Sequence, residues 1–420
     1  HARKHGGDSD RSDGRRQIIL DRKKGTGSSG AQLRRACPLF FDHPCEVGLV
    51  SKRILHIIPT LERLGAEKQL TLLATALDRE EFDVHVCAIN NGGPYVNDLE
   101  AAGISTTILN CRIASPTVFR QLKREITRVK PDIVQTWRAE ANLWGRIAAR
   151  RCGVKQTVAC EPYLDPRRTA IRSRLDRHLT RSTSKIVVNS QGVKDFLTRR
   201  HIQGDLITII PNGVGPASSS PCPRSEILDE LKLLPNTKLI GMAAALEPQK
   251  RIKDAIWAAD LLKVMRDDVH LLVLGDGPMR DRLIRFQEAV RIKDHVHFLG
   301  TRNDVLRFIP HFDLYWSTSS YESQSNGILE AMAASVPVLA TDIPGSRELV
   351  SHKETGWIIP TYGNDFRRRR SEFARQSQLV LDDGDLLKKL GKAARNKARD
   401  QFSVEQMIEY WSDLYRELLR

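Results

Sequence analysis

Short apolar segments rich in β-branched residues alternate with amphipathic segments from Lys52 onward. The apolar segments of the first half are RILHIIP, FDVHVCAIN, ISTTILN, DIVQTW, QTVACE, KIVVNS and LITIIPN. Stretches such as EKQLTLLATALD and FRQLKREITRVK lie between them and have the apolar spacing of helices. Continuous apolar strands that alternate with helices are typical of a parallel sheet covered on both faces. The pattern therefore predicts an α/β domain over residues 51–215.

A second alternation of the same kind follows the segment PNGVGPASSSPCPRSE, which is rich in Pro, Gly and Ser. We interpret residues 216–235 as a linker and 236–402 as a second domain. The strands expected in it are KLIGMAAAL, HLLVLGDG, HVHFLG, DLYWSTS, PVLAT and GWIIP. The predicted fold class is α/β, with two Rossmann-like, doubly wound parallel-sheet domains that face a cleft. Residues 1–50 have little apolar periodicity, and we expect them to be a disordered basic extension.

Two carboxylates flank a predicted helix start in the second domain. Glu322 and Glu330 lie eight positions apart. Glu322 follows the expected strand FDLYWSTS, and Glu330 lies near the start of the helix-forming segment ILEAMAAS. Asn326, Gly327 and Ile328 should begin this helix. A helix start offers unpaired backbone N–H groups and the positive end of the helix dipole, which together attract phosphate. Gly327 would let a phosphate approach the backbone closely.

The spacing of the two carboxylates suits a nucleotide-sugar. Eight helical steps span about 12 Å at roughly 1.5 Å per residue, which is of the order of the distance from the sugar to the ribose. Glu322 and Glu330 could then hold hydroxyl groups on either side of a diphosphate. Two solvated glutamates also occur by chance at this spacing in many helices, so the pair alone leaves both interpretations open.

The sequence around the pair favours the first interpretation. EAMAASVPVLATDIPGSRELV resembles the donor-site signature of the retaining GT-B glycosyltransferases of the "group 1" (glycosyltransferase family 4-like) family, and the resemblance extends over most of residues 53–420. It implies that Glu330 holds the ribose of a nucleotide-sugar and Glu322 the donor hexose. It also implies transfer with retention of configuration, without a metal or another cofactor. In this fold the last helix, here about 403–420, returns to the first domain.

Lys250 lies in ALEPQKRIKDAI, between a predicted strand and a predicted helix. By the resemblance it meets the donor diphosphate, where a cation would offset the charge of the leaving group. The family usually has an Arg five positions earlier, and this chain has Ala245. Arg251 is a candidate substitute for that arginine. A solvated lysine beside other cations is the alternative interpretation.

Glycines mark two further turns that resemble donor-binding segments of the family. Gly275, in LVLGDGPMRDRL, fits a tight turn between a strand and a helix, and HFLGTRNDV resembles the segment that seats the nucleotide base. Gly65, in IPTLERLGAEKQL, matches the second glycine of a loop that approaches the donor phosphates, while Leu64 replaces the first. Each glycine alone is also consistent with an ordinary turn.

Two acidic positions are candidates for contacts with substrate. Glu140, in DIVQTWRAEANLWGRIAARRCGV, stands where family members often have a His that faces the acceptor. A carboxylate there could bind an acceptor hydroxyl or act as a base, and a surface charge on a helix is an equal alternative. Gly345 and Glu348, in TDIPGSRELV, match a loop that closes over the sugar.

The chain has a formal net charge of +15, placed unevenly along its length. Residues 51–215 have 26 basic against 16 acidic residues, whereas residues 216–420 have 30 against 29. No apolar run approaches the roughly 20 residues that span a bilayer. The seven cysteines form no C-x-x-C pair, and no acidic D-x-D pair suits a metal bound to a diphosphate. We expect no metal site and a cytoplasmic protein.

A run of arginines at roughly helical spacing occupies PRRTAIRSRLDRHLTRSTSK, residues 166–185. Acidic phospholipid, a pyrophosphate-linked lipid acceptor and nucleic acid all offer complementary charge. We favour weak contact with an anionic membrane at its inner face over a merely solvated helix face. No nucleic-acid partner is expected, because aromatic stacking platforms are not evident. FRRRRSE, which contains Arg367 to Arg370, is interpreted as an exposed loop.

The combined prediction is a glycosyltransferase that moves a sugar from a nucleotide-sugar to a glycan or glycolipid acceptor in polysaccharide or glycoconjugate synthesis. One alternative is a nucleotide-sugar epimerase on the same fold. Another is a catalytically lapsed protein that binds a nucleotide-sugar or glycan, because Ala245, Leu64 and Glu140 depart from the family pattern.

Overall fold

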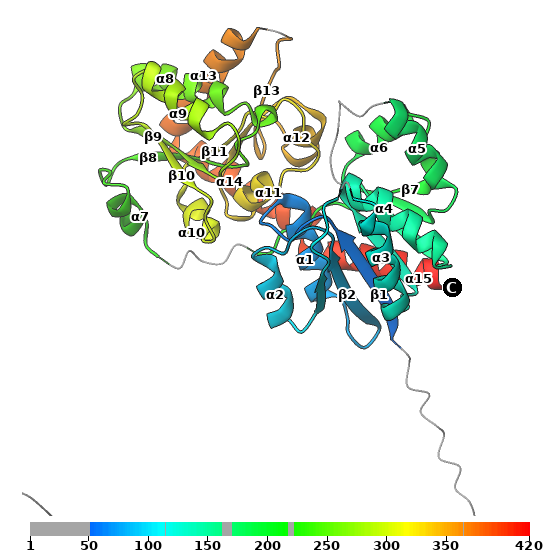
Figure 1. Cartoon of the computed structure of the whole chain (residues 1–420). Coiled ribbons are helices and arrows are strands. Elements are labelled where there is room, and N and C mark those ends of the chain that lie inside the picture. The colour runs from blue at the N-terminus through cyan, green and yellow to red at the C-terminus, as the bar shows by residue number, and fades with distance from the viewer. Residues whose placement is uncertain (1–50, 114, 162–169, 217–221, 364) are drawn as a thin grey trace, which may run out of the picture. The chain divides into compact units, whose positions relative to one another are not determined.

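A computed structural model of the chain describes residues 51–113, 115–161, 170–216, 222–363 and 365–420 (Figure 1). The predicted extension at residues 1–50 lies outside the described residues. In the described part of the chain, the strands form two separate parallel sheets, as the sequence predicts.

The first sheet has the strand order β3-β2-β1-β4-β5-β6-β7 among the described residues, and every pairing in it is parallel. Its strands are β1 (Lys52–Ile58), β2 (Phe82–Ala88), β3 (Ser105–Ile108), β4 (Ile133–Trp137), β5 (Gln156–Cys160), β6 (Lys185–Val188) and β7 (Ile207–Ile209). The order reverses between β1 and β4, so the loops after these two strands leave the same edge of the sheet on opposite sides.

The second sheet has the order β10-β9-β8-β11-β12-β13, again with parallel pairings throughout the described residues. Its strands are β8 (Lys238–Ala243), β9 (Val269–Leu274), β10 (Val296–Gly300), β11 (Leu314–Ser317), β12 (Val338–Thr341) and β13 (Gly356–Ile359). Here β8 and β11 are the neighbours at which the order reverses. The loops that follow them carry Lys250 and Glu322, which explains why residues 72 positions apart can meet.

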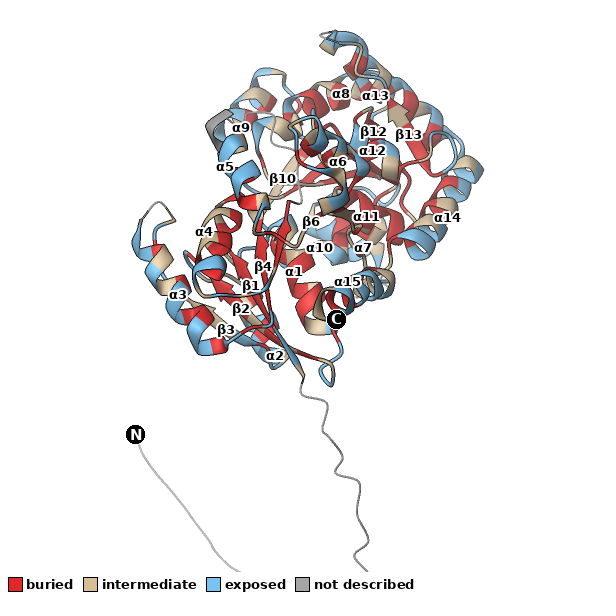
Figure 2. Ribbon diagram, turned by 90° about the vertical axis from the view of Figure 1, so that its right-hand side faces the viewer, coloured by how far each residue is buried: buried red, intermediate tan, exposed pale blue. Residues whose placement is uncertain are grey.

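Helices cover both faces of the first sheet, whose strands are largely buried (Figure 2). One apolar layer lies under α1 (Gly65–Ala76), with α2 (Tyr95–Ala101) and the C-terminal α15 (Val404–Leu419) beside it. The opposite layer lies under α3 (Thr117–Val129) and α4 (Arg138–Arg151). Along the remaining strands run α5 (Ala170–Thr180) and α6 (Gln191–Thr198).

The return of α15 to the first sheet rests on aromatic packing. Trp411 and Tyr415 are buried in the same apolar cluster as the strand residues Ile54 and Phe82. The hydroxyl of Tyr415 donates a hydrogen bond to the buried side chain of Gln135 on β4. A sequence that lies after the second sheet therefore completes the core of the first.

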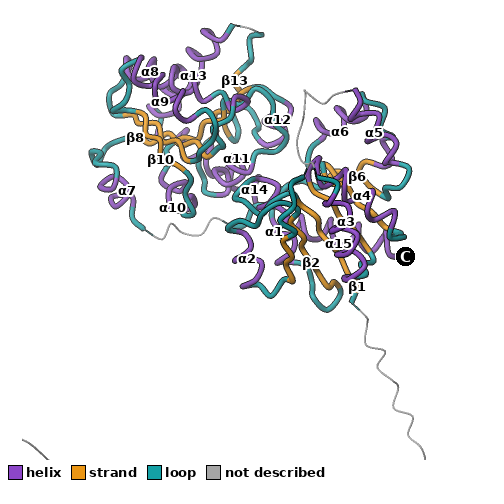
Figure 3. Tube along the Cα trace, in the orientation of Figure 1, coloured by secondary structure: helices purple, strands orange, loops and turns teal. Residues whose placement is uncertain are grey.

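The second sheet is likewise enclosed between helices (Figure 3). One face packs against α8 (Ile252–Met265), α9 (Arg280–Ala289) and α13 (Phe366–Asp382). The other packs against α7 (Arg224–Glu230), α10 (Val305–Phe308), α11 (Asn326–Ala333) and α14 (Gly384–Gln401). The short α12 (Pro344–Leu349) follows β12.

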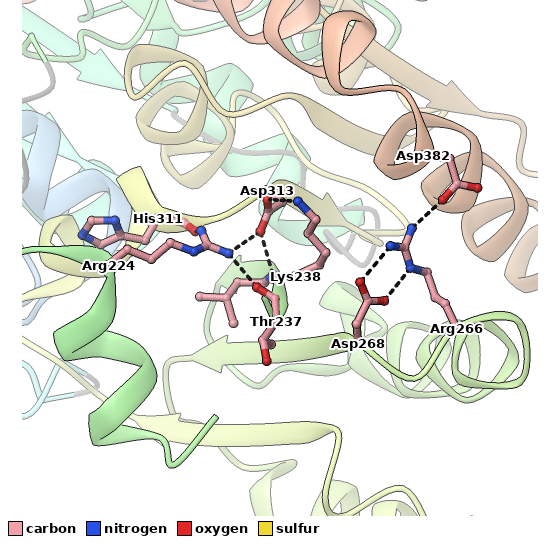
Figure 4. A network of polar contacts seen from close by, with 9 residues as sticks. Arg224, Thr237, Lys238, Arg266, Asp268, His311, Asp313 and Asp382 are labelled. Carbon is pink, nitrogen blue, oxygen red and sulfur yellow. Dashed lines mark hydrogen bonds and ion pairs between the residues drawn. The ribbon is translucent and has the colours of Figure 1, made fainter. Parts of the chain in front are cut away.

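The prediction of a linker at 216–235 is partly wrong, because α7 lies within this range and packs against the second sheet. Ile227 and Leu228 are buried in its apolar core. Arg224 donates hydrogen bonds to the carboxylate of Asp313 at 2.6 Å and to the backbone carbonyl of Thr237 at 2.8 Å (Figure 4). The Pro- and Ser-rich composition concealed a short amphipathic helix. Residues 217–221 of the predicted linker lie outside the described residues.

The prediction that FRRRRSE is an exposed loop is also wrong, because the segment begins α13. Arg369 and Arg370 both donate to Asp254 at 2.7 Å, and Arg251 donates to it at 2.6 Å. Burial opposes ionisation of Asp254, but hydrogen bonds from Arg251, Arg370 and Arg369 outweigh it and lower the pKa of the carboxyl. The sequence could not show this cluster, since Asp254 and Arg370 lie 116 positions apart.

None of the helices in the described part of the chain is long and apolar enough to cross a membrane. Of the basic run, Arg174, Arg177 and Arg181 are exposed on α5 and the turn after it. Arg167 and Arg168 lie outside the described residues.

Replacement of Asp254 by Ala should destabilise the protein strongly, because three guanidinium groups would lose their shared acceptor in a buried position. Loss of one partner of a buried ion pair costs about 3–5 kcal/mol, which thermal unfolding would report as a lower Tm. The lowered pKa means that the unfolded chain binds the proton more readily. The stabilisation should therefore be present at neutral pH and fade as the pH falls through the folded-state pKa.

Asp400→Ala provides the matched control. Asp400 pairs with Arg399 on an exposed part of α14, where an ion pair contributes little to stability. Equal effects of the two substitutions would contradict the structural role given to Asp254.

Candidate functional site

The loops after β8 and β11 bring Lys250 and Glu322 together. The ammonium group of Lys250 donates to one carboxylate oxygen of Glu322, and the hydroxyl of Ser319 donates to the other at 2.8 Å. The hydroxyl of Thr318 donates to the backbone carbonyl of Lys250 at 2.7 Å, which fixes one loop against the other. Both charged side chains are about 15% exposed, so the pair is accessible while its position is set by the backbone.

Helix α11 begins at Asn326, as the sequence predicts. The residue before it, Ser325, gives no side-chain cap to the first turn. The backbone N–H groups at the start of the helix thus keep their capacity to bind an anion. Ile328 is 1% exposed in the apolar core, so its contribution to a ligand would be restricted to its backbone.

Close packing gives Gly327 a structural reason to lack a side chain. A Cβ at this position would overlap the hydroxyl of Tyr315 and lie 2.9 Å from the carbonyl oxygen of Ala243. The Tyr315 hydroxyl is fixed there, because it donates to the Ala243 carbonyl and accepts from the Ala243 N–H, each at 3.1 Å. The absent side chain of Gly327 therefore lets α11 pack closely on β8 and β11.

The side chain of Asn326 connects α11 to the segments of the first sheet. It donates to the carbonyl of Gly65 at 3.0 Å, and accepts from Gln69 at 3.1 Å and from Asn212 at 2.9 Å. Gln69 in turn exchanges two hydrogen bonds of 2.9 Å with the backbone of Gly213. Gln69 and Asn212 are not among the residues that the sequence predicts for the site; Asn212 lies in the segment PNG that follows β7.

Glu330 is paired with a residue that the sequence did not single out. The ammonium group of Lys68 on α1 lies 2.5 Å from a carboxylate oxygen of Glu330, and the two side chains are 29% and 11% exposed. Lys68 lies three residues after Gly65 and thus one helical turn away. That spacing from the glycine loop was the signal that could have identified it.

The two remaining predicted glycines have backbone roles. Gly65 is the first residue of α1 and is exposed beside Asn326. Gly275 has a φ of +134°, and a Cβ there would overlap the carbonyl of Ala244. Such a conformation is open to glycine alone among the common residues. The loop after β9 therefore rests directly against the loop that carries Ala245.

Arg251, the predicted substitute cation, is paired with Asp254 in this structure. Its guanidinium donates to Asp254 and lies 4.3 Å from the ring centroid of Phe366. The left-handed backbone of Arg251, with a φ of 51°, turns the chain between Lys250 and the start of α8.

Glu140 is not joined to these contacts in the described part of the chain. It lies in the first turn of α4, and one of its carboxylate oxygens is buried without a hydrogen-bond partner among the described residues. Two residues earlier, Arg138 has a φ of 68° and donates to the fully buried Glu67 at 2.9 Å. A buried carboxylate, Glu67, is thus paired with Arg138 directly after the end of β4.

Glu348 contacts helix α6, which lies along the first sheet, rather than the Lys250 pair. Its carboxylate accepts from the backbone N–H of Gly192, at the start of α6, at 3.0 Å. Burial raises the pKa of Glu348, against the opposing effect of backbone N–H donors and of Gln324. Gly345, before it, packs directly on the backbone carbonyl of Ser323, so α12 supports the loop that carries Glu322.

Two family models match the chain. The model described as "Glycosyl transferases group 1" matches residues 223–397, and "Glycosyltransferase Family 4" matches residues 64–218. Between them they take in every described strand of the two sheets except β1. The chain belongs to the group 1 glycosyltransferases.

Relatives of known name are similar over most of the chain. The UDP-Gal:alpha-D-GlcNAc-diphosphoundecaprenol alpha-1,3-galactosyltransferase of Escherichia coli is 25% identical over 366 residues, which cover 82% of this chain and 91% of that protein. The putative glycosyltransferase EpsD of Bacillus subtilis is 26% identical over 80% of this chain and 89% of its own length.

The fold has a solved counterpart in Anabaena Alr3699/HepE, crystallised in complex with UDP-glucose. The TM-score is 0.76 at 22% identity, and the match covers 87% of this chain and 99% of that one. The predicted GT-B architecture of two Rossmann-like domains is thereby confirmed.

Gly327→Ala should destabilise the protein, because the new methyl group would force α11 away from Tyr315. Overpacking of this kind costs about 1–3 kcal/mol, measurable as a decrease in the free energy of unfolding in urea. In a Tyr315→Phe background the overlapping hydroxyl is absent, so the penalty of Gly327→Ala should be smaller there.

Gly384→Ala, at the start of α14, is the control, because an added Cβ meets nothing within 4 Å. It should be neutral or slightly stabilising. A Gly327→Ala variant as stable as this control would show that the close packing of α11 is not needed.

Proposed function

We propose that the protein transfers a hexose from a nucleotide-sugar to a glycan or lipid-linked acceptor. The observation that carries the proposal is the pair of carboxylates on either side of the start of α11, each within ion-pair distance of a lysine. Glu330 would hold the ribose and Glu322 the hexose. Their separation along the chain suits the sugar and ribose at the two ends of a diphosphate.

Lys250 and the first backbone N–H groups of α11 would hold the diphosphate. As the bond between sugar and phosphate breaks, negative charge grows on the departing phosphate beside an oxocarbenium-like centre. A fixed ammonium group and helix start at that position stabilise the transition state more than the ground state. We propose that transfer proceeds with retention of configuration and without a metal.

The relatives support a uridine nucleotide and a lipid-linked acceptor. UDP-galactose and a diphosphoundecaprenol-linked acceptor are named for the E. coli enzyme, and UDP-glucose is bound in the Anabaena protein. The exposed arginines of α5 and the turn after it suit weak contact with an anionic membrane on its cytoplasmic side. We expect that contact to fade as salt is raised.

The role of Glu330 can be tested with two ligands and two proteins. Calorimetric titration should give UDP a lower Kd than 2′,3′-dideoxy-UDP for the unmodified protein, by about 10-fold or more, as expected for hydrogen bonds to a charged group. Glu330→Ala should bind the two ligands equally, because the carboxylate that distinguishes them is gone.

Glu409→Ala, on an exposed position of α15, should keep the preference of the unmodified protein. A preference retained in Glu330→Ala would contradict the assignment of the ribose. Release of UDP from UDP-hexoses that depends on an added glycan or lipid-linked acceptor would support the transferase. An altered sugar formed without acceptor would favour an epimerase, and binding without turnover would favour a lapsed enzyme.

A further inference from the structure

Each carboxylate of the candidate site is neutralised by a lysine from a different part of the chain. Glu322 is paired with Lys250, which lies in the loop after β8 of the second sheet. Glu330 is paired with Lys68 on α1, a helix that covers the first sheet. The proposed function gives Lys250 a ligand but leaves Lys68 without a role.

Lys68 is held beside α11 by the backbone around it. Asn326 binds the carbonyl of Gly65 and the side chain of Gln69, so the first turn of α1 is attached to the first residue of α11 on both sides of Lys68. The ammonium group therefore remains near the start of α11 even when its contact with Glu330 is broken.

The pairing with Glu330 cannot persist if a ribose is bound there in the proposed way. Hydroxyl groups that donate to Glu330 would take the oxygen on which Lys68 now rests. Within the described residues, Glu330 is the one carboxylate at ion-pair distance from Lys68. Displacement of Lys68 from Glu330 would leave a half-buried ammonium group without a counter-charge. That is costly in free energy unless another anion replaces the carboxylate.

The ligand itself brings that anion. A nucleoside diphosphate carries its negative charge next to the ribose, and two helices of opposite sheets, α1 and α11, begin at the contact between Gly65 and Asn326. Both helix starts favour negative charge. On the side of the second sheet, Ala245 is uncharged and Arg251 is engaged by Asp254, so Lys250 meets the diphosphate without help from either of these two positions.

We propose that Lys68 is a second diphosphate-binding residue, which pairs with Glu330 in this structure and transfers to the phosphates when the ribose displaces it. The inference rests on the proposed binding of a nucleoside diphosphate at this site. It exchanges one ion pair between side chains for one between Lys68 and the ligand, together with new hydrogen bonds from the ribose to Glu330.

The test is calorimetric titration of UDP into the full chain and into Lys68→Met. If Lys68 binds the diphosphate, its loss should raise the Kd by about 10- to 100-fold, as for a lost hydrogen bond between charged groups. If Lys68 only covers Glu330, its removal should free the carboxylate, and UDP should bind as tightly as before or more tightly. The sign of the change therefore decides between the two roles.

Three comparisons separate a charge effect from a structural one. Lys68→Arg should retain most of the affinity, and Ala245→Arg in the Lys68→Met background should restore part of it by supplying a cation from the second sheet. The affinity of Lys68→Met should also depend less steeply on salt than that of the unmodified protein. An unchanged salt dependence would overturn the proposal.

Nucleotide binding by the unmodified protein and by Lys68→Met distinguishes failure of the proposed function from failure of the role of Lys68. If the unmodified protein binds none of UDP, GDP and ADP, the proposed function fails and the role of Lys68 fails with it. If the unmodified protein binds UDP and Lys68→Met binds it equally well or better, the role of Lys68 alone is wrong.

Discussion

The side chain of Asn326 joins the beginnings of two helices that cover different sheets, and the geometry of the candidate site depends on this contact. Its amide reaches Gly65 and Gln69 on α1 and Asn212 after β7. Two positive helix ends would repel one another if nothing else lay between them. The amide contacts hold them together, and the resulting positive potential makes this position suited to an anion with two negative charges.

The same arrangement explains why carboxylates and lysines occur in pairs. Glu322 and Glu330 are partly buried, and a carboxylate in that environment needs a counter-charge or hydrogen bonds. In this structure lysines supply the counter-charge, whereas the proposed nucleotide-sugar would supply hydroxyl groups to the carboxylates and phosphates to the lysines. Such binding would replace existing interactions instead of creating charged groups without partners.

Much of the fold could be predicted because it follows from local patterns. The apolar, β-branched segments became strands of two parallel sheets, and the helix at Asn326 begins where the change of composition indicated. The partners of charged side chains could not be predicted in this way. Lys68 and Glu330 lie 262 positions apart. Asp254 accepts hydrogen bonds from arginines of a segment whose composition indicates a polar loop. The close packing of Gly327 on Tyr315, a residue 12 positions earlier, could not be predicted either.

A crystal structure of the protein with UDP tests the central claim most directly. We predict ribose hydroxyls within hydrogen-bond distance of Glu330, the diphosphate against the start of α11 and the ammonium group of Lys68 removed from Glu330. UDP bound elsewhere, or bound with the contact between Lys68 and Glu330 intact, would contradict it.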